Sequence, residues 1–164
     1  MSMTSAQKNQ IAQRIIQDLK TLQHEIQLSK FNFMDILAMS LAEHSFITAH
    51  PQEGIRRSNE MSFETDSGHR IMVTRSTSNK VYFHDRHGFL PHPSQQGPVQ
   101  KECDFILIII LDNKLNRYEA ILIDWDNLPP FLKFDWKQDL WHTYVSQDFL
   151  DHSVIIDNYF IPQF

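Results

Sequence analysis

Apolar residues recur every three or four positions near the start of the chain, a spacing that places them on one face of a helix. An amphipathic helix over about residues 5–29 is predicted by the series Ile11, Ile15, Leu19, Leu22 and Ile26. The preceding segment "TSAQ" has a threonine and a glutamine three positions apart, as in a capping box. We therefore expect this helix to begin directly after Thr4.

A second helix is predicted from Phe33 to about Glu43, with Asn32 as its cap. Its inward face would carry Ile36, Leu37 and Leu41. Pro51 should prevent a long extension, because proline lacks the amide hydrogen that the helix needs.

The period then changes from that of helices to that of strands. The stretches "MSFET" and "HRIMVTR" flank "DSG", in which Gly68 can adopt the positive φ of a tight hairpin turn. The stretch "KVYFH" follows as a third strand, so this region is interpreted as a β-meander. The next stretch, "HGFLPHPSQQGPVQKE", is rich in proline and glycine and indicates a long loop.

The run "FILIIIL", from Phe105 to Leu111, is apolar at every position. Such a run indicates a central strand buried on both faces. A polar turn over 112–116 and a second strand from Tyr118 to Trp125 should follow, and further along we expect a short helix over about 138–149 and a final strand over 154–161. The sequence thus predicts one α+β domain over residues 1–164, in which two N-terminal helices pack on a mixed or antiparallel sheet of about five strands.

The order of these elements and two short stretches resemble the restriction-endonuclease-like superfamily, in particular its small bacterial domains. In those domains a strand reading roughly Ile-Gln-Val-Lys-Thr is followed by a loop and by a buried strand that begins with Asp. The corresponding stretches here are "RIMVTRS" and "CDFILIIILDNKLNRYEAILI". The resemblance covers about residues 35–128 and implies a restriction-endonuclease-like fold.

The resemblance also implies a degenerate active site. Active members bind divalent metal with an Asp and with an acid or Gln that lies two strand positions before a catalytic Lys. Those two strand positions fall at Met72 and Thr74 in this chain. A thioether is a poor ligand for a hard cation, and a hydroxyl cannot supply the charge of an ammonium group. We therefore expect a protein without catalytic activity.

Two metal-dependent alternatives stay open. A divergent nuclease would use Glu64 and Asp66 with Mg²⁺ or Mn²⁺, with help from Glu43 and the histidines at 84 or 87. Separately, the loop "HDRHGFLPH" gathers potential ligands of a metal ion, although their spacing matches no known metal motif and a surface loop is the simpler interpretation. These potential ligands are His84, Asp85, His87 and His92. We expect no cofactor otherwise.

Composition narrows the classes of partner and the compartment. The formal net charge is −5, which gives no general attraction to nucleic acid or to an anionic membrane. The N-terminus has no leader pattern, and the longest apolar run is far below the roughly 20 residues that span a bilayer. The single cysteine suits a reducing compartment. We expect a cytoplasmic protein that does not enter membranes.

Basic residues are nevertheless concentrated in one region of the chain. A local basic patch there would bind phosphates, which keeps nucleic-acid binding without cleavage as another alternative. The residues of this patch would be Arg56, Arg57, Arg70 and Arg75.

The C-terminal part is acidic and aromatic. Residues 103–164 hold ten acidic side chains and four basic ones. Aromatic anchors surrounded by carboxylates are typical of a surface that binds a basic protein. The preferred hypothesis is an immunity or inhibitor protein that neutralises a basic, nuclease-type toxin, and its predicted binding residues are Trp125, Asp126, Phe134, Asp135, Trp136, Asp139 and Trp141.

Overall fold

The computed structural model describes residues 4–26, 30–59, 61–83, 93–94, 103–112 and 117–160. Three α-helices are present there: α1 (Ser5–Ile26), α2 (Lys30–Ala49) and α3 (Gln147–Asp151). Two 3₁₀ turns are η1 (Trp125–Asn127) and η2 (Pro129–Phe131). The strands are β1 (Ile55–Asn59), β2 (Ser62–Thr65), β3 (Arg70–Ser76), β4 (Lys80–Phe83), β5 (Phe105–Leu111), β6 (Arg117–Asp124), β7 (Lys133–Asp135), β8 (Leu140–Tyr144) and β9 (Val154–Phe160).

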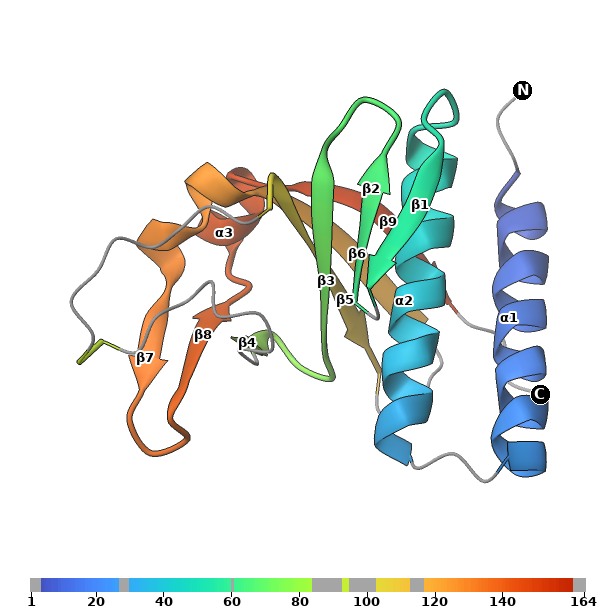
Figure 1. Ribbon diagram of the computed structural model, residues 1–164, viewed down its shortest axis with the longest axis horizontal. Coiled ribbons are helices and arrows are strands. Elements are labelled where there is room, and N and C mark those ends of the chain that lie inside the picture. Colours follow the sequence, from blue (N-terminus) through green and yellow to red (C-terminus); the bar gives the residue numbers. More distant parts are fainter. Residues whose placement is uncertain are drawn as a thin grey trace.

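These elements form successive layers (Figure 1). Helix α1 lies on the outside against α2, and α2 covers one face of a six-stranded sheet. A three-stranded sheet of β4, β8 and β7 lies on the other side, together with α3. The predicted α+β class, with N-terminal helices and a mixed sheet, is confirmed. The larger sheet has six strands where about five were predicted, and the three-stranded second sheet was not anticipated.

The larger sheet has the order β1-β2-β3-β5-β6-β9. Its neighbouring strands are antiparallel except β3 and β5, which run parallel. Parallel neighbours cannot be joined by a tight turn, so the chain leaves the sheet between them, and there it forms β4. The smaller sheet is antiparallel, in the order β4-β8-β7.

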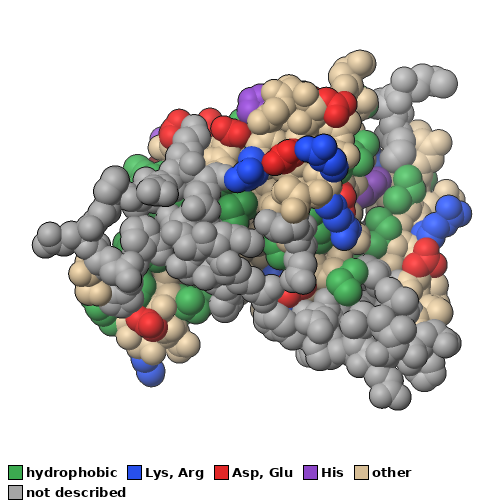
Figure 2. All heavy atoms as spheres, in the orientation of Figure 1, with side chains coloured by type: hydrophobic (Ala, Val, Ile, Leu, Met, Phe, Trp, Pro, Cys, Tyr) green, Lys and Arg blue, Asp and Glu red, His purple; other side chains and the backbone are tan. Residues whose placement is uncertain are grey.

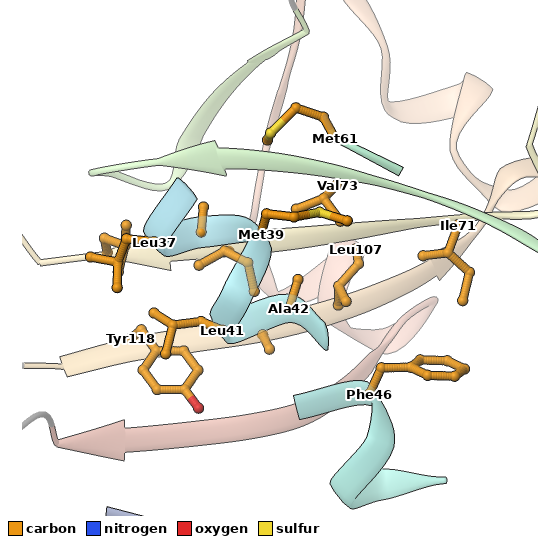
Figure 3. Packing of buried hydrophobic residues seen from close by; sticks show 14 of the residues in the cluster. Leu37, Met39, Leu41, Ala42, Phe46, Met61, Ile71, Val73, Leu107 and Tyr118 are labelled. Carbon is orange, nitrogen blue, oxygen red and sulfur yellow. The ribbon is translucent and has the colours of Figure 1, made fainter. Parts of the chain in front are cut away.

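Strand β5 lies between two apolar cores and contributes side chains to both. Its side chains alternate between the faces, as the geometry of a strand requires. Leu107 and Ile109 join α2 in the first core, part of which is drawn in Figure 3. Ile106 and Ile108 enter the second core, between the two sheets. All four are at most 1% exposed, which confirms the predicted central strand.

The helix predictions are partly confirmed. The Thr4 hydroxyl accepts from the Gln7 amide at 3.2 Å, and the Thr4 amide donates to the Gln7 side chain at 2.8 Å, which is the expected capping box. Helix α2 is longer than predicted and already includes Asn32, so that residue is not its cap. Leu37 is fully buried, and α2 ends two residues before Pro51.

The strand predictions fail mainly outside the larger sheet. The turn at Gly68, with φ of 89°, joins β2 to β3 as predicted. The expected third strand of the meander, β4, instead pairs with β8. A helix was predicted over 138–149, but β8 and the five-residue α3 occupy that range. Strand β1 was not anticipated. Among the described helices, none is long and apolar enough to cross a membrane.

Candidate protein-binding hairpin

The two positions that the resemblance assigns to metal chemistry lie over the second core. Strand β3 runs beside β5, with Met72 opposite Ile106 and Thr74 opposite Ile108. Met72 is 9% exposed and packs in the cluster that contains Phe83 of β4. The second sheet therefore covers this part of β3, and Met72 serves as a core residue.

The carboxylates of the nuclease alternative have different partners in the structure. Glu64 accepts from Arg56 at 3.1 Å and from Arg70 at 3.4 Å. Asp66 accepts from the Gly54 amide at 3.1 Å, and so joins the β2–β3 turn to the segment before β1. Within the described ranges, no group of three His, Cys, Asp or Glu side chains could hold a metal ion. The predicted loop ligands His84, Asp85, His87 and His92 lie outside those ranges.

Glu43 of α2 takes part in a different contact, an ion pair with Arg57 of β1. Arg75 of β3 likewise pairs with Asp35 of α2 at 2.7 Å. These two arginines therefore point to the helix side of the larger sheet.

The other two arginines belong to a row that crosses three strands. Arg56, Glu64 and Arg70 are register partners on β1, β2 and β3. Figure 2 shows blue and red side chains next to each other over this part of the molecule. The structure thus divides the four arginines of the nucleic-acid alternative between the two faces of the sheet, and each is paired with a carboxylate.

The predicted aromatic binding residues separate into two groups. Trp125 is only 4% exposed and belongs to the second core, so the structure corrects its assignment as a surface anchor. The neighbouring Asp126 is exposed in η1, and its amide donates to the Asp124 carboxylate, which caps this turn. The remaining aromatic residues lie together on the hairpin of β7 and β8.

This hairpin carries an exposed tryptophan, Trp136, that packs against the ring of Phe134. The Phe134 ring lies 4.9 Å from the Trp136 ring and 5.3 Å from the Trp141 ring, edge to face in both cases. Trp136 is 68% exposed, the largest fraction among the large hydrophobic residues of the described part. Figure 2 shows green, red and blue side chains at this end of the molecule.

The hairpin turn is fixed by two aspartates. The Asp135 carboxylate accepts from the Lys137 amide at 3.0 Å and from the Gln138 amide at 3.1 Å. These bonds, above all that from Gln138, and the Tyr82 hydroxyl lower the pKa of Asp135. Asp139 has φ of 57°, a left-handed conformation that aspartate tolerates better than most residues. These features order the turn that carries Trp136.

The outward face of the smaller sheet carries a second polar group that the sequence analysis did not single out. Tyr82 lies opposite His142 in the register, and Lys80 lies opposite Tyr144. The Tyr82 hydroxyl donates to Asp135 at 2.9 Å. The alternation in "KVYF" and "LWHTY" is the only signal that could have found this face, and it depends on knowing that the two strands pair.

His142 is the most buried member of this face. It is 7% exposed, and its ring lies 5.6 Å from the Tyr82 ring and 5.5 Å from the Tyr144 ring. Its Nδ1 atom has no hydrogen-bond partner among the described residues. Burial lowers the pKa of His142 below its ordinary value of 6.5, and the charges of Lys80 and Lys133 act in the same direction, against Asp135.

We expect His142 to make the protein less stable in acid. Because the pKa is lower in the folded state, the unfolded chain binds the proton first, and stability falls as the pH drops below 6.5 towards the lower folded value. The unfolding midpoint should therefore decrease between neutral and mildly acidic pH, by less in His142→Gln. An identical decrease in both proteins would assign the effect to the other histidines.

No protein-family model matches the chain, and no curated protein is significantly similar to it in sequence. A function for this chain must therefore be argued from its geometry.

Proposed function

We propose that this chain is a non-catalytic protein that binds another macromolecule through the β7–β8 hairpin. The observation that carries the proposal is Trp136, a large aromatic side chain that is 68% exposed on a preordered turn. Exposing an indole ring to water is unfavourable, and rigid tryptophans are frequent energetic centres of protein interfaces. Phe134, which itself packs on Trp141, would limit the entropy lost on binding, because its contact already restricts the Trp136 ring.

The partner we propose is a basic protein, for instance a nuclease-type toxin that this chain neutralises as an immunity or inhibitor protein. The excess of acidic over basic residues from 103 to 164 supports this choice, because it would steer a cationic partner towards this half of the chain. Asp126 and Asp139 are exposed there. The buried Met72 supports a role without catalysis, because a metal ligand at that position would have no access to solvent. A cytoplasmic location and a distant relation to the restriction-endonuclease-like superfamily complete the proposal.

The decisive experiment is affinity capture from the native host with the full chain, followed by mass spectrometry of the bound proteins. We expect one stoichiometric basic protein, and Trp136→Ala should weaken its binding by about thirtyfold or more, since interface tryptophans commonly contribute at least about 2 kcal/mol. If the partner is a nuclease, the wild-type chain should inhibit its cleavage of DNA or RNA.

Ile47→Ala is the matched control, because Ile47 is 44% exposed on α2, away from the hairpin. This variant should retain the partner fully. Equal binding by wild type and Trp136→Ala would contradict the assignment of the hairpin. Cleavage by the chain itself with Mg²⁺ or Mn²⁺, lost in Asp66→Ala, would contradict the non-catalytic role. Affinity of the chain for DNA or RNA that falls steeply with salt concentration would favour the alternative in which the arginines bind nucleic acid.

A further inference from the structure

The outward face of the smaller sheet surrounds one ammonium group with two aromatic rings and a carboxylate. The Lys80 Nζ atom lies 4.9 Å from the centre of the Tyr82 ring and 5.6 Å from that of the Tyr144 ring. The same atom lies 3.5 Å from the Asp135 carboxylate. These residues come from β4, β8 and β7, so the pairing of all three strands creates the arrangement, which we term the cation cage: Tyr82, Tyr144 and Asp135.

The chemistry of the cage suits a cation. The face of a tyrosine ring carries a negative potential that attracts an ammonium ion, and the carboxylate adds a full negative charge. The Tyr82 side chain is the leading cause of a raised pKa of Lys80, so the charged form of the lysine is favoured there. The Tyr82 hydroxyl also donates to Asp135 and holds the carboxylate in position. The chain therefore already shows the cage in contact with one ammonium group.

Lys80 is suited to leave the cage. Its ammonium group is carried on a flexible four-carbon stem, its side chain is 32% exposed, and its distance to Asp135 is long for an ion pair. Tyr144 is 50% exposed, so one wall of the cage is open to solvent. An incoming ammonium group would replace Lys80 with little change in charge, while Lys80 returned to water.

We propose that the cation cage is a binding site for a lysine side chain of the partner, and that Lys80 occupies it in the free protein. This inference rests on the proposed function, because it assigns part of the basic partner's recognition to a defined site. Asp135 links the cage to the turn, since its carboxylate accepts from the amides of the turn that presents Trp136 and also forms one side of the cage. Lys133, opposite His142 on β7, is a further cation on this face and would disfavour ligands with more than one clustered charge.

The test uses the full chain and tetramethylammonium chloride, with the tyrosine ring signals followed by NMR. Lys80→Met removes the ammonium group from the cage and keeps most of the length of the side chain. We expect it to bind tetramethylammonium with a dissociation constant about tenfold lower than that of the wild type, in which Lys80 competes. Lys133→Met is the matched control, since it removes one charge from the same face and leaves Lys80 in place. It should behave as the wild type does.

Adding Tyr144→Ala to Lys80→Met should abolish the gain. Equal affinity in Lys80→Met and Lys133→Met would overturn the proposal, because the gain would then come from net charge. Lys80→Ala serves as the second variant, and failure of both Lys80 variants to fold would also overturn it, since the ammonium group would then be a structural tie. The titration needs no partner protein, so its result is independent of whether the capture experiment succeeds.

Discussion

Introducing a carboxyl group at the buried position of β3 should destabilise the protein strongly. We expect Met72→Glu to lower the free energy of unfolding by at least about 3 kcal/mol at neutral pH, because the side chain would enter the apolar layer between the two sheets. Val81, Phe83 and Ile106 belong to that layer and offer no side chain that could pair with a charge. Urea unfolding followed by circular dichroism measures the effect.

Two control variants separate charge from shape. Met72→Leu keeps the volume nearly constant and should cost less than about 1.5 kcal/mol. Met72→Gln has the length of glutamate without its charge. Burial would raise the pKa of the new carboxyl group, so the deficit of Met72→Glu relative to Met72→Gln should grow from about pH 4 to about pH 8. A deficit that does not depend on pH would mean that the carboxylate reaches solvent.

The same substitution tests what the resemblance implies about activity. Met72→Glu combined with Thr74→Lys restores the two strand residues of the catalytic superfamily pattern. We expect no cleavage of DNA with Mg²⁺, because β4 and its neighbours cover this part of β3. A folded double variant that cleaves DNA would show that the face is accessible, and it would argue strongly for descent from a nuclease.

The sequence predicted those elements whose pattern depends on local geometry. Thr4 and Gln7 are three residues apart, and a capping box needs nothing else. The β2–β3 hairpin depended on Gly68 and its positive φ. The central position of β5 followed from a run of side chains with no polar face, because only a strand covered on both sides can have that composition.

The smaller sheet could not be predicted in the same way, because its pairing is long-range. Strands β4 and β8 lie about sixty residues apart in the chain, with Lys80 opposite Tyr144. Nothing local indicates that β4 leaves the larger sheet. The error over 138–149 has a related cause, since the short strand β8 is stabilised by both of its neighbours and resembles a helix-compatible aromatic segment when read alone.

The sequence indicated the segment that carries the candidate site, but not which of its aromatic side chains are exposed, because exposure depends on long-range pairing. The composition pointed to the segment from Trp125 to Trp141, yet it could not tell which tryptophan faces solvent. Trp125 closes the second core, whereas Trp136 lies beyond the end of β7. Lys80, which lies between Tyr82, Tyr144 and Asp135, is distant in sequence from that segment, so no pattern within the segment indicates these contacts.

A cavity in the first core should reveal whether the two cores unfold together. Leu107 is fully buried on β5, between Val73 of β3 and Leu122 of β6 in the register (Figure 3). We expect Leu107→Ala to lower the free energy of unfolding by about 3 kcal/mol, the middle of the range for such truncations. Ile155→Ala removes the same number of carbon atoms from a side chain that is 49% exposed, and it should cost less than about 1 kcal/mol.

Tryptophan fluorescence can follow unfolding of this variant from the side of β5 opposite the cavity. The three tryptophans, at 125, 136 and 141, belong to the second core or to the hairpin, whereas the cavity would lie on the helix side of β5. If β5 couples the cores, tryptophan fluorescence and the helical circular dichroism signal should shift to the same lower urea concentration. Unchanged fluorescence with an early loss of helix would instead mean that the layers unfold separately. Coincident transitions would explain how the larger sheet keeps the hairpin ordered.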